Sequence, residues 1–244
     1  MVLICGVMGS PTRLFADDAS AKAEIEVLNQ RVVQLFGEGQ YEAAITSAER
    51  SLDLASKTLG ADHPDTAVSL NNLAALYRST GRYAAAEPLY LRALKIREAK
   101  LGADHPDTAQ SLNNLAGLYS SMGRYADAEP LYRRALKLNE AKLGADHPTT
   151  AHSLNNLALL YQTMGRYAEA EPLYQRALKI NEAKLGADHP AIALSLNNLA
   201  VLHAEQGRWA EAVGGVDRAR RSLLRHVSRV LPALAEKEIG RAHV

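Results

Sequence analysis

Apolar residues recur at helical spacing in short stretches that are separated by glycine-containing turns. Within residues 65–102, a first stripe follows the i, i+3, i+4, i+7 spacing of an amphipathic helix and comprises Leu70, Leu73, Ala74 and Tyr77. A second stripe follows Gly81-Arg82 and comprises Ala86, Tyr90, Ala93, Leu94 and Ile96. This stretch therefore predicts two helices joined by a tight turn.

The whole pattern repeats every 42 residues. The six letters LGADHP occur four times at this interval, and SLNNLA and the pair Gly-Arg recur in register with them. A diverged copy around Gly39-Gln40-Tyr41 precedes them. The period predicts an all-α array whose first and last members are atypical, as terminal caps should be. The predicted units are residues 25–60, 65–102, 107–144, 149–186 and 191–224.

The repeated LGADHP segment has the residues of a corner between two helices. Gly60 accepts the left-handed backbone that ends a helix, and Pro64 suits the first turn of the next one. The corner also carries a histidine in four copies: His63, His105, His147 and His189. Because successive units lie at least about 8–10 Å apart, these rings cannot share a metal that needs its nitrogen ligands at about 2 Å. The sequence therefore predicts a structural role for them and no metal or cofactor.

The order HPD, LNNLA, GRY and AEPLY resembles the kinesin-light-chain type of tetratricopeptide repeat, over residues 25–224. The resemblance implies antiparallel helix pairs stacked into a solenoid, a right-handed superhelix with a concave groove. It also implies a protein–protein interaction scaffold that binds an extended peptide or partner protein, with no catalysis in this chain. The repeated tyrosines, such as Tyr90, are expected in the core.

Both end units depart from the repeat. Arg31 replaces the leucine of NNLA in the first unit, and Gly214-Gly215 replaces the EP of AEPLY in the last. Glycine inside a helix costs about 1 kcal/mol relative to alanine. We therefore expect these two units to be the looser ones.

One asparagine recurs in all five units, on a helix face distinct from the packing face: Asn29, Asn71, Asn113, Asn155 and Asn197. The resemblance places this face along the groove, where such asparagines contact bound peptide. An amide both donates and accepts, so it can pair with any peptide backbone. Hydrogen bonding between neighbouring helices is the alternative for these residues, and it is the favoured role for the second asparagine of each SLNNLA segment.

The groove neighbours of these asparagines vary between units. They become polar in the middle of the array and apolar towards its C-terminal end, and we include Val68, Arg78, Gln110, His152, Gln162 and Leu194 in the candidate peptide-binding surface. Arg78 can recognise an acidic side chain. The residues that differ between units would set the ligand preference.

Charge and motifs narrow the classes of function. The net charge is +1, which gives no basic footprint for nucleic acid. The single cysteine, Cys5, allows neither an internal disulfide nor a cysteine-rich metal site. No phosphate-binding loop, zinc signature or nucleophile elbow is present. The chain is therefore not expected to be an enzyme, and its expected partner is a protein or peptide.

Residues 1–24 are expected to be signal-peptide-like or disordered. Their apolar stretch, Val2 to Met8, is too short to cross a bilayer, and no basic residues precede it as in a typical signal peptide. Cytoplasmic and exported locations stay equally open, and no transmembrane segment is expected.

Residues 216–237 read as a basic capping helix and connector, with Pro232 ending the helix. A helix for a membrane surface or an acidic partner is the alternative. The stretch also resembles the connector that follows such repeats in bacterial CHAT-domain proteins. The alternative function is thus the recognition part of a truncated CHAT-type, caspase-like cysteine protease whose C-terminal effector domain is missing from this chain. Residues 238–244 match a translated sequencing adapter and are predicted to be a non-native tail.

Overall fold

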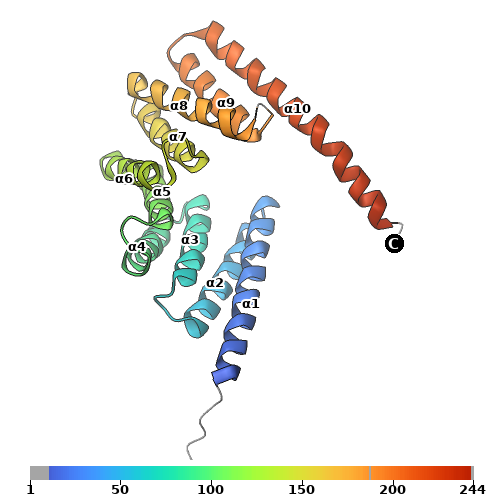
Figure 1. Cartoon of the computed structure of the whole chain (residues 1–244). Helices are drawn as coiled ribbons and strands as arrows, with labels where there is room; N and C mark the ends of the chain where they lie inside the picture. Colours follow the sequence, from blue (N-terminus) through green and yellow to red (C-terminus); the bar gives the residue numbers. More distant parts are fainter. Residues whose placement is uncertain (1–10, 187, 243–244) are drawn as a thin grey trace, which may run out of the picture. The chain divides into compact units, whose positions relative to one another are not determined.

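The computed structural model describes residues 11–186 and 188–242, with side chains described for residues 20–186 and 188–230. Val2 to Met8, and Cys5 with them, lie outside the described residues. The chain divides into two compact units, Met1–Met122 and Gly123–Val244. Within the described residues every regular element is an α-helix, which confirms the all-α prediction (Figure 1).

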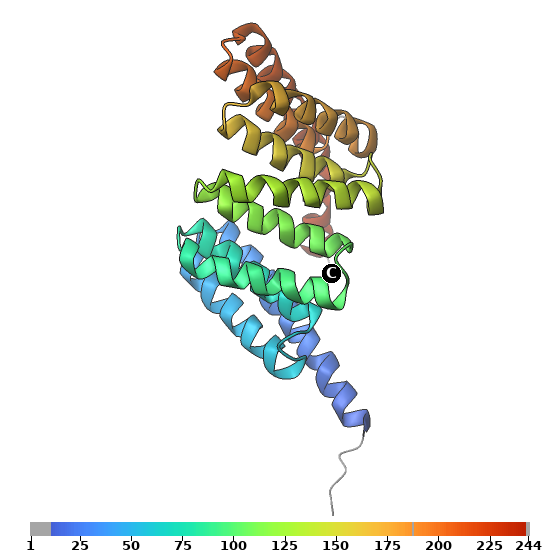
Figure 2. The ribbon, with the colours of Figure 1, turned by 90° about the vertical axis from the view of Figure 1, so that its left-hand side faces the viewer.

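Consecutive helices pack on each other within each unit (Figure 2). Unit 1 contains α1 (Pro11–Gly37), α2 (Tyr41–Thr58), α3 (Pro64–Ser79), α4 (Tyr83–Lys100) and α5 (Pro106–Ser121). Unit 2 contains α6 (Tyr125–Leu143), α7 (Pro148–Thr163), α8 (Tyr167–Leu185), α9 (Pro190–Glu205) and α10 (Trp209–Ala242). We call α1, α3, α5, α7 and α9 the first helices and the others the second helices.

Small residues let the two helices of a pair approach closely. In α3 and α4, Ala67 and Ala93 are fully buried beside Leu70 and Ile96. The equivalent residues of α7 and α8 form the same cluster 84 positions later, with Ala151, Leu154, Ala177 and Ile180. The apolar stripes seen in the sequence are thus the core between paired helices. Tyr90, Tyr132 and Tyr174 are buried as expected, whereas Tyr83, Tyr125 and Tyr167 are only half-buried.

The LGADHP corner forms the cap that begins each of four first helices. Gly60 has a φ of +102°, which explains the glycine at this position, and Pro64 occupies the first turn of α3. His63 is the N-cap residue, and its ring Nδ1 accepts a hydrogen bond from the backbone N–H of Asp65 at 3.1 Å. His105, His147 and His189 make the same bond at 3.1–3.2 Å. The structural role of the four histidines is this capping bond.

The two terminal helices differ from the expected boundaries. Helix α1 begins at Pro11, well before residue 25. Helix α10 continues through Pro232 to Ala242, so the prediction that Pro232 ends it is wrong. A proline removes one backbone donor from a helix, and this chain already accommodates an exposed proline inside α4, α6 and α8: Pro88, Pro130 and Pro172.

Candidate functional site

The first helices line one side of each unit. In unit 1, α1 contacts α3 and α3 contacts α5; in unit 2, α7 contacts α9. No corresponding contact joins α2 to α4 or α8 to α10 among the described residues. Because the first helices converge while the second helices separate, the first helices form the inner side of each unit. All the predicted groove residues lie on these inner helices.

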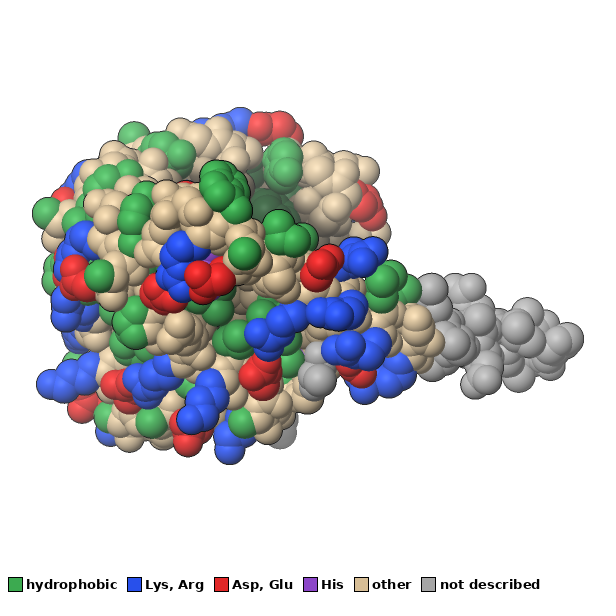
Figure 3. All heavy atoms as spheres, turned by 90° about the horizontal axis from the view of Figure 1, so that it is seen from above, with side chains coloured by type: hydrophobic (Ala, Val, Ile, Leu, Met, Phe, Trp, Pro, Cys, Tyr) green, Lys and Arg blue, Asp and Glu red, His purple; other side chains and the backbone are tan. Residues whose placement is uncertain are grey.

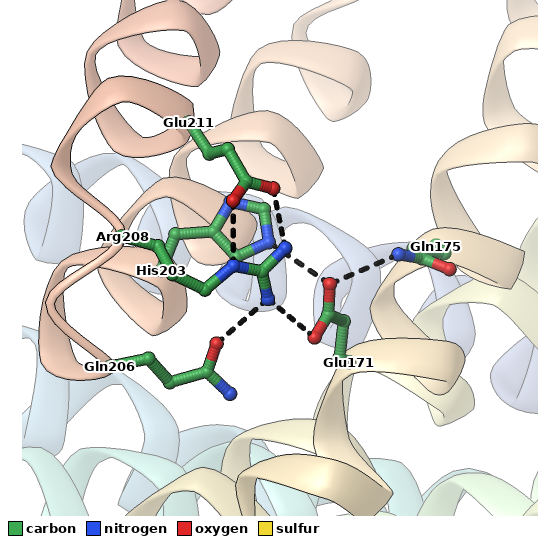
Figure 4. Close-up of polar contacts among 6 residues, drawn as sticks. All are labelled: Glu171, Gln175, His203, Gln206, Arg208 and Glu211. Atoms are coloured by element: carbon green, nitrogen blue, oxygen red, sulfur yellow. Dashed lines mark hydrogen bonds and ion pairs between the residues drawn. The ribbon is translucent and has the colours of Figure 1, made fainter.

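The turn between the helices of a pair carries an arginine that holds neighbouring pairs together. In unit 2, Arg208 donates to Glu171 at 2.8 Å and also pairs with Glu211, while Nε2 of His203 lies 3.2 Å from Glu171 (Figure 4). The hydrogen bond from Arg208 is the main cause that lowers the pKa of Glu171. We call this group the arginine clamp.

A second clamp in unit 2 has the same design. Arg166 donates to Glu129 at 2.7 Å and lies 4.2 Å from the ring centroid of Tyr161, whose hydroxyl also donates to Glu129. Burial raises the pKa of Glu129, but the hydrogen bonds from Arg166, Arg133 and Tyr161 outweigh it, so the net shift is downward. The repeated Gly-Arg pair is visible in the sequence, but its spacing alone predicts no role for the arginine. The glutamate of AEP, 37 residues earlier in both clamps, was the available signal.

In unit 1 the recurring asparagines bond between helices. Asn71 is buried; its Nδ2 donates to the carbonyl of Ala67 at 2.9 Å and to Ser111 at 3.3 Å. Its Oδ1 accepts from Asn114, and Oδ1 of Asn29 accepts from Asn72 at 3.2 Å in the same manner. The second asparagine of one helix pair thus donates to the first asparagine of the preceding helix pair. These bonds correspond to the alternative role, hydrogen bonding between neighbouring helices.

Exposure separates the recurring asparagines into three groups. Asn71 and Asn113 are buried, Asn29 and Asn155 are half-buried, and Asn197 is exposed. A buried amide that already bonds a neighbouring helix is poorly placed to meet a ligand. In unit 2, Asn155 also donates to Ser195 of α9, at 3.5 Å, and its Oδ1 is buried. The accessible amide of unit 2 is therefore that of Asn197 on α9.

Apolar side chains accompany this amide on the inner side of unit 2. Leu159 on α7 and Leu194 and Val201 on α9 are each more than half exposed. His152, one turn before Asn155, is exposed as well. Gln162 differs, because it is buried, accepts from the hydroxyl of Tyr174 at 2.9 Å and donates to Glu205 at 3.0 Å. We leave Gln162 out of the candidate surface.

The inner side of unit 1 is more polar and holds a small cavity. Gln110 is exposed, and Val68 and Arg78 are half-buried. A cavity of about 210 Å³ lies between α1 and α3 and includes Asn29 and Val68 in its lining, with Lys22, Ile25, Glu26 and Asp65. Two of the predicted groove residues thus face one hollow.

Two further features limit the chemistry of the described residues. No cluster of three or more histidine, cysteine, aspartate or glutamate side chains suited to a metal ion occurs among them. None of their helices combines the length and apolar character that crossing a membrane requires. Acidic and basic side chains are intermixed on the surface seen in Figure 3.

Stacked, capped helix pairs with a fixed 42-residue period define an α-helical repeat protein. A tetratricopeptide-repeat profile matches residues 24–99, 70–141, 107–183 and 149–219, and the chain belongs to the tetratricopeptide-repeat family. Proteins of this family act as protein-binding scaffolds.

Solved structures support the same assignment. A Podosopora anserina protein described as a kinesin light chain with nearly identical TPR-like repeats is 25% identical, with a TM-score of 0.62 over 89% of this chain and 98% of that chain. BtubC (BKLC) from P. vanneervenii is 25% identical, with a TM-score of 0.66 over 86% of this chain and 90% of that one. A Rap protein solved with Competence and Sporulation Factor shares the fold at 19% identity, with a TM-score of 0.71 over 82% of this chain and 54% of that one. No curated protein compared with the chain matches it.

Proposed function

We propose that this chain is a scaffold that holds an extended peptide segment of a partner protein against the inner side of unit 2. The observation that carries the proposal is the set of exposed side chains on α7 and α9: Leu159, Leu194, Asn197 and Val201. Exposed apolar groups next to an exposed amide are the usual composition of a recognition surface. Catalysis has no part in this proposal.

The two kinds of side chain have different tasks in the proposed complex. Asn197 pairs with the peptide backbone, because a primary amide offers both donors and an acceptor, whereas Asn155 is engaged with Ser195 of α9. Leu159, Leu194 and Val201 take apolar side chains of the peptide, which gives a preference for sequence. Leucine-sized burial contributes about 1.5–3 kcal/mol per side chain, so the apolar residues supply most of the affinity.

In unit 1 the proposed surface is a secondary one. Val68, Gln110 and Arg78 are accessible there, and Arg78 is suited to an acidic side chain of the same partner. Asn71 stays in its helix-to-helix hydrogen bonds, Asn113 is buried, and neither binds the peptide.

A selection experiment tests the proposal. The intact protein is used to select binders from a displayed library of random 12-residue peptides, and the dissociation constant of each selected peptide is measured by isothermal titration calorimetry. Leu159→Asp with Leu194→Asp is expected to weaken binding at least about tenfold, because each change places a charge where an apolar side chain docks. Leu91→Asp on α4 makes the same change at an exposed leucine of a second helix and should leave binding unchanged.

The opposite pattern contradicts the proposal. Selected peptides that bind the double variant as tightly as the unchanged protein, while circular dichroism shows both folded, would place recognition elsewhere on the chain. A loss of binding caused equally by Leu91→Asp would do the same.

A further inference from the structure

Helix α10 has one face on α9 and another that is apolar and open. The packed face is made of small residues, including Ala212, Gly215, Ala219 and Ser222. The open face carries six large apolar side chains that are all exposed: Trp209, Val213, Val216, Leu223, Leu224 and Val227. We call these six residues the α10 apolar face. Exposed apolar groups gathered on one helix in this way mark an interaction site.

The residues 42 positions earlier show how the equivalent face of α8 is packed. Val216 occupies the position of Tyr174 on α8, and Leu223 occupies the position of Asn181. Tyr174 and Asn181 are 0% and 4% exposed, and Asn181 donates to Ser195 of α9 at 3.2 Å. Val216 and Leu223 are 51% and 40% exposed. In α8 this face is directed at the first helix that follows, and in α10 it is open.

The same interface recurs in unit 1. Tyr90 and Leu94 on α4 are the equivalents of Val216 and Arg220, and both are buried in the unit where α4 packs on α5. The α10 apolar face is therefore a continuation of an interface that the chain has already built at α4–α5 and α8–α9.

We propose that the α10 apolar face binds an amphipathic helix of a partner protein, one with a stripe of small residues and leucines and with acidic residues beside it. The stripe follows from the helices that cover the equivalent faces, which all contain SLNNLA. The acidic residues follow from charge: by helical spacing Arg220 lies among Val216, Leu223 and Leu224, it is exposed, and its one ion pair among the described residues is with Asp217 at 3.8 Å.

An arginine on such a face is compatible with a covering helix. Arg97 of α4 is 4% exposed, yet its guanidinium donates to the carbonyl of Asp107 at 2.7 Å and to Ser111 at 3.1 Å, both on α5. The helix that covers it thus satisfies its donors. Arg220 can be satisfied in the same way by polar oxygens of a partner helix.

A second copy of this chain is a poorer occupant. The helix that would continue the stack from another copy is α1, but its residues at the positions of Ser69, Leu73 and Leu76 are Val27, Arg31 and Gln34. Arg31 and Gln34 are exposed and polar where an apolar stripe is needed. Pairing two copies of α10 would instead bring the arginines of both helices together, which is unfavourable.

Trp209, the one tryptophan of the chain, reports on this face because it is 67% exposed there. The full chain is titrated with a 16-residue peptide of the sequence of residues 190–205, and with the same peptide carrying Glu in place of Asn197 and Val201. A saturable blue shift of the emission is expected for both, with tighter binding of the acidic peptide at low salt. Leu223→Asp should weaken both at least about tenfold, while Leu91→Asp, at 44% exposure on α4, should not.

Three results would overturn the inference. One is no saturable shift of the emission up to about 1 mM peptide. Another is equal binding by Leu223→Asp and the unchanged protein. The third is a blue shift that grows with protein concentration without peptide, together with a dimer mass by light scattering, since a second copy would then be the occupant.

Discussion

Gly214 and Gly215 are neighbours in α10 with different surroundings. A Cβ at Gly214 would meet nothing within 4 Å. A Cβ at Gly215 would lie 3.0 Å from Cβ of Ala200 and 3.4 Å from the carbonyl oxygen of Leu196, both on α9. Gly215 thus permits the close approach of α10 to α9, whereas Gly214 serves no packing purpose.

These surroundings lead to opposite expectations for alanine at the two positions. Gly214→Ala should raise the stability of unit 2 by up to about 1 kcal/mol, because alanine loses less backbone freedom in a helix. Gly215→Ala should gain less or lose stability, because α10 must move away from α9. Urea unfolding followed by circular dichroism measures the difference. Equal effects of the two changes would mean that α10 does not approach α9 this closely.

For single residues, the sequence predicts local backbone roles better than contacts with neighbouring helices. The glycine, proline and histidine of the LGADHP corner each have one local task, so spacing alone predicted a corner. The recurring asparagines have two competing tasks, and burial decides between them. Burial depends on the neighbouring pair, which a single stripe does not reveal, so Asn71 and Asn197 could not be told apart in advance.

Pairs of helices are joined by the arginine clamp as well as by apolar packing. Glu171 is held by Arg208, by the adjacent His203 and by Gln175, which donates to it at 3.2 Å. The lowered pKa of Glu171 means that its charged form is favoured in the folded chain. Its contribution to stability is therefore complete above the ordinary glutamate pKa of 4.5 and is lost as the pH falls through the lowered folded value.

Because the pKa of Glu171 is lowered in the folded chain, the effect of Glu171→Gln on stability should depend on pH. At pH 6 the variant should be less stable than the unchanged protein by about 1 kcal/mol. The difference should shrink as the pH falls below 4.5, because protonation then removes the same charge from Glu171. Urea unfolding at several pH values measures it. Glu26→Gln, at an exposed carboxylate without an ion pair among the described residues, is the control. A difference that stays constant down to pH 3 would show that the clamp carries no charge-dependent stability.

The sequence predicted the elements themselves closely, because 42-residue spacing, glycine turns and apolar stripes all report the same helix pairs. Their outer ends were harder to predict. Pro232 signals the end of a helix, but one proline removes a single hydrogen bond and the rest of a long helix outweighs it. A capping helix was predicted for residues 216–237, but only the structure shows that Val216 and Leu223 are exposed on it.

The inner side of unit 2 carries apolar side chains that packing between its helices does not require. Packing alone would favour polar residues at Leu159, Leu194 and Val201, since their burial stabilises no helix pair. In the proposed complex, a bound peptide covers them and lies beside Asn197. The proposed function therefore depends on whether a bound peptide lies on the first helices or on the second helices.

Photo-crosslinking tests that position most directly. A selected peptide carrying a diazirine group at each position in turn is irradiated with the intact protein, and the crosslinked residues are identified by mass spectrometry. We expect crosslinks on α7 and α9, at or next to Asn155, Leu159, Leu194, Asn197 and Val201. Crosslinks gathered on the second helices α6 and α8 instead, with these inner residues unlabelled, would contradict it.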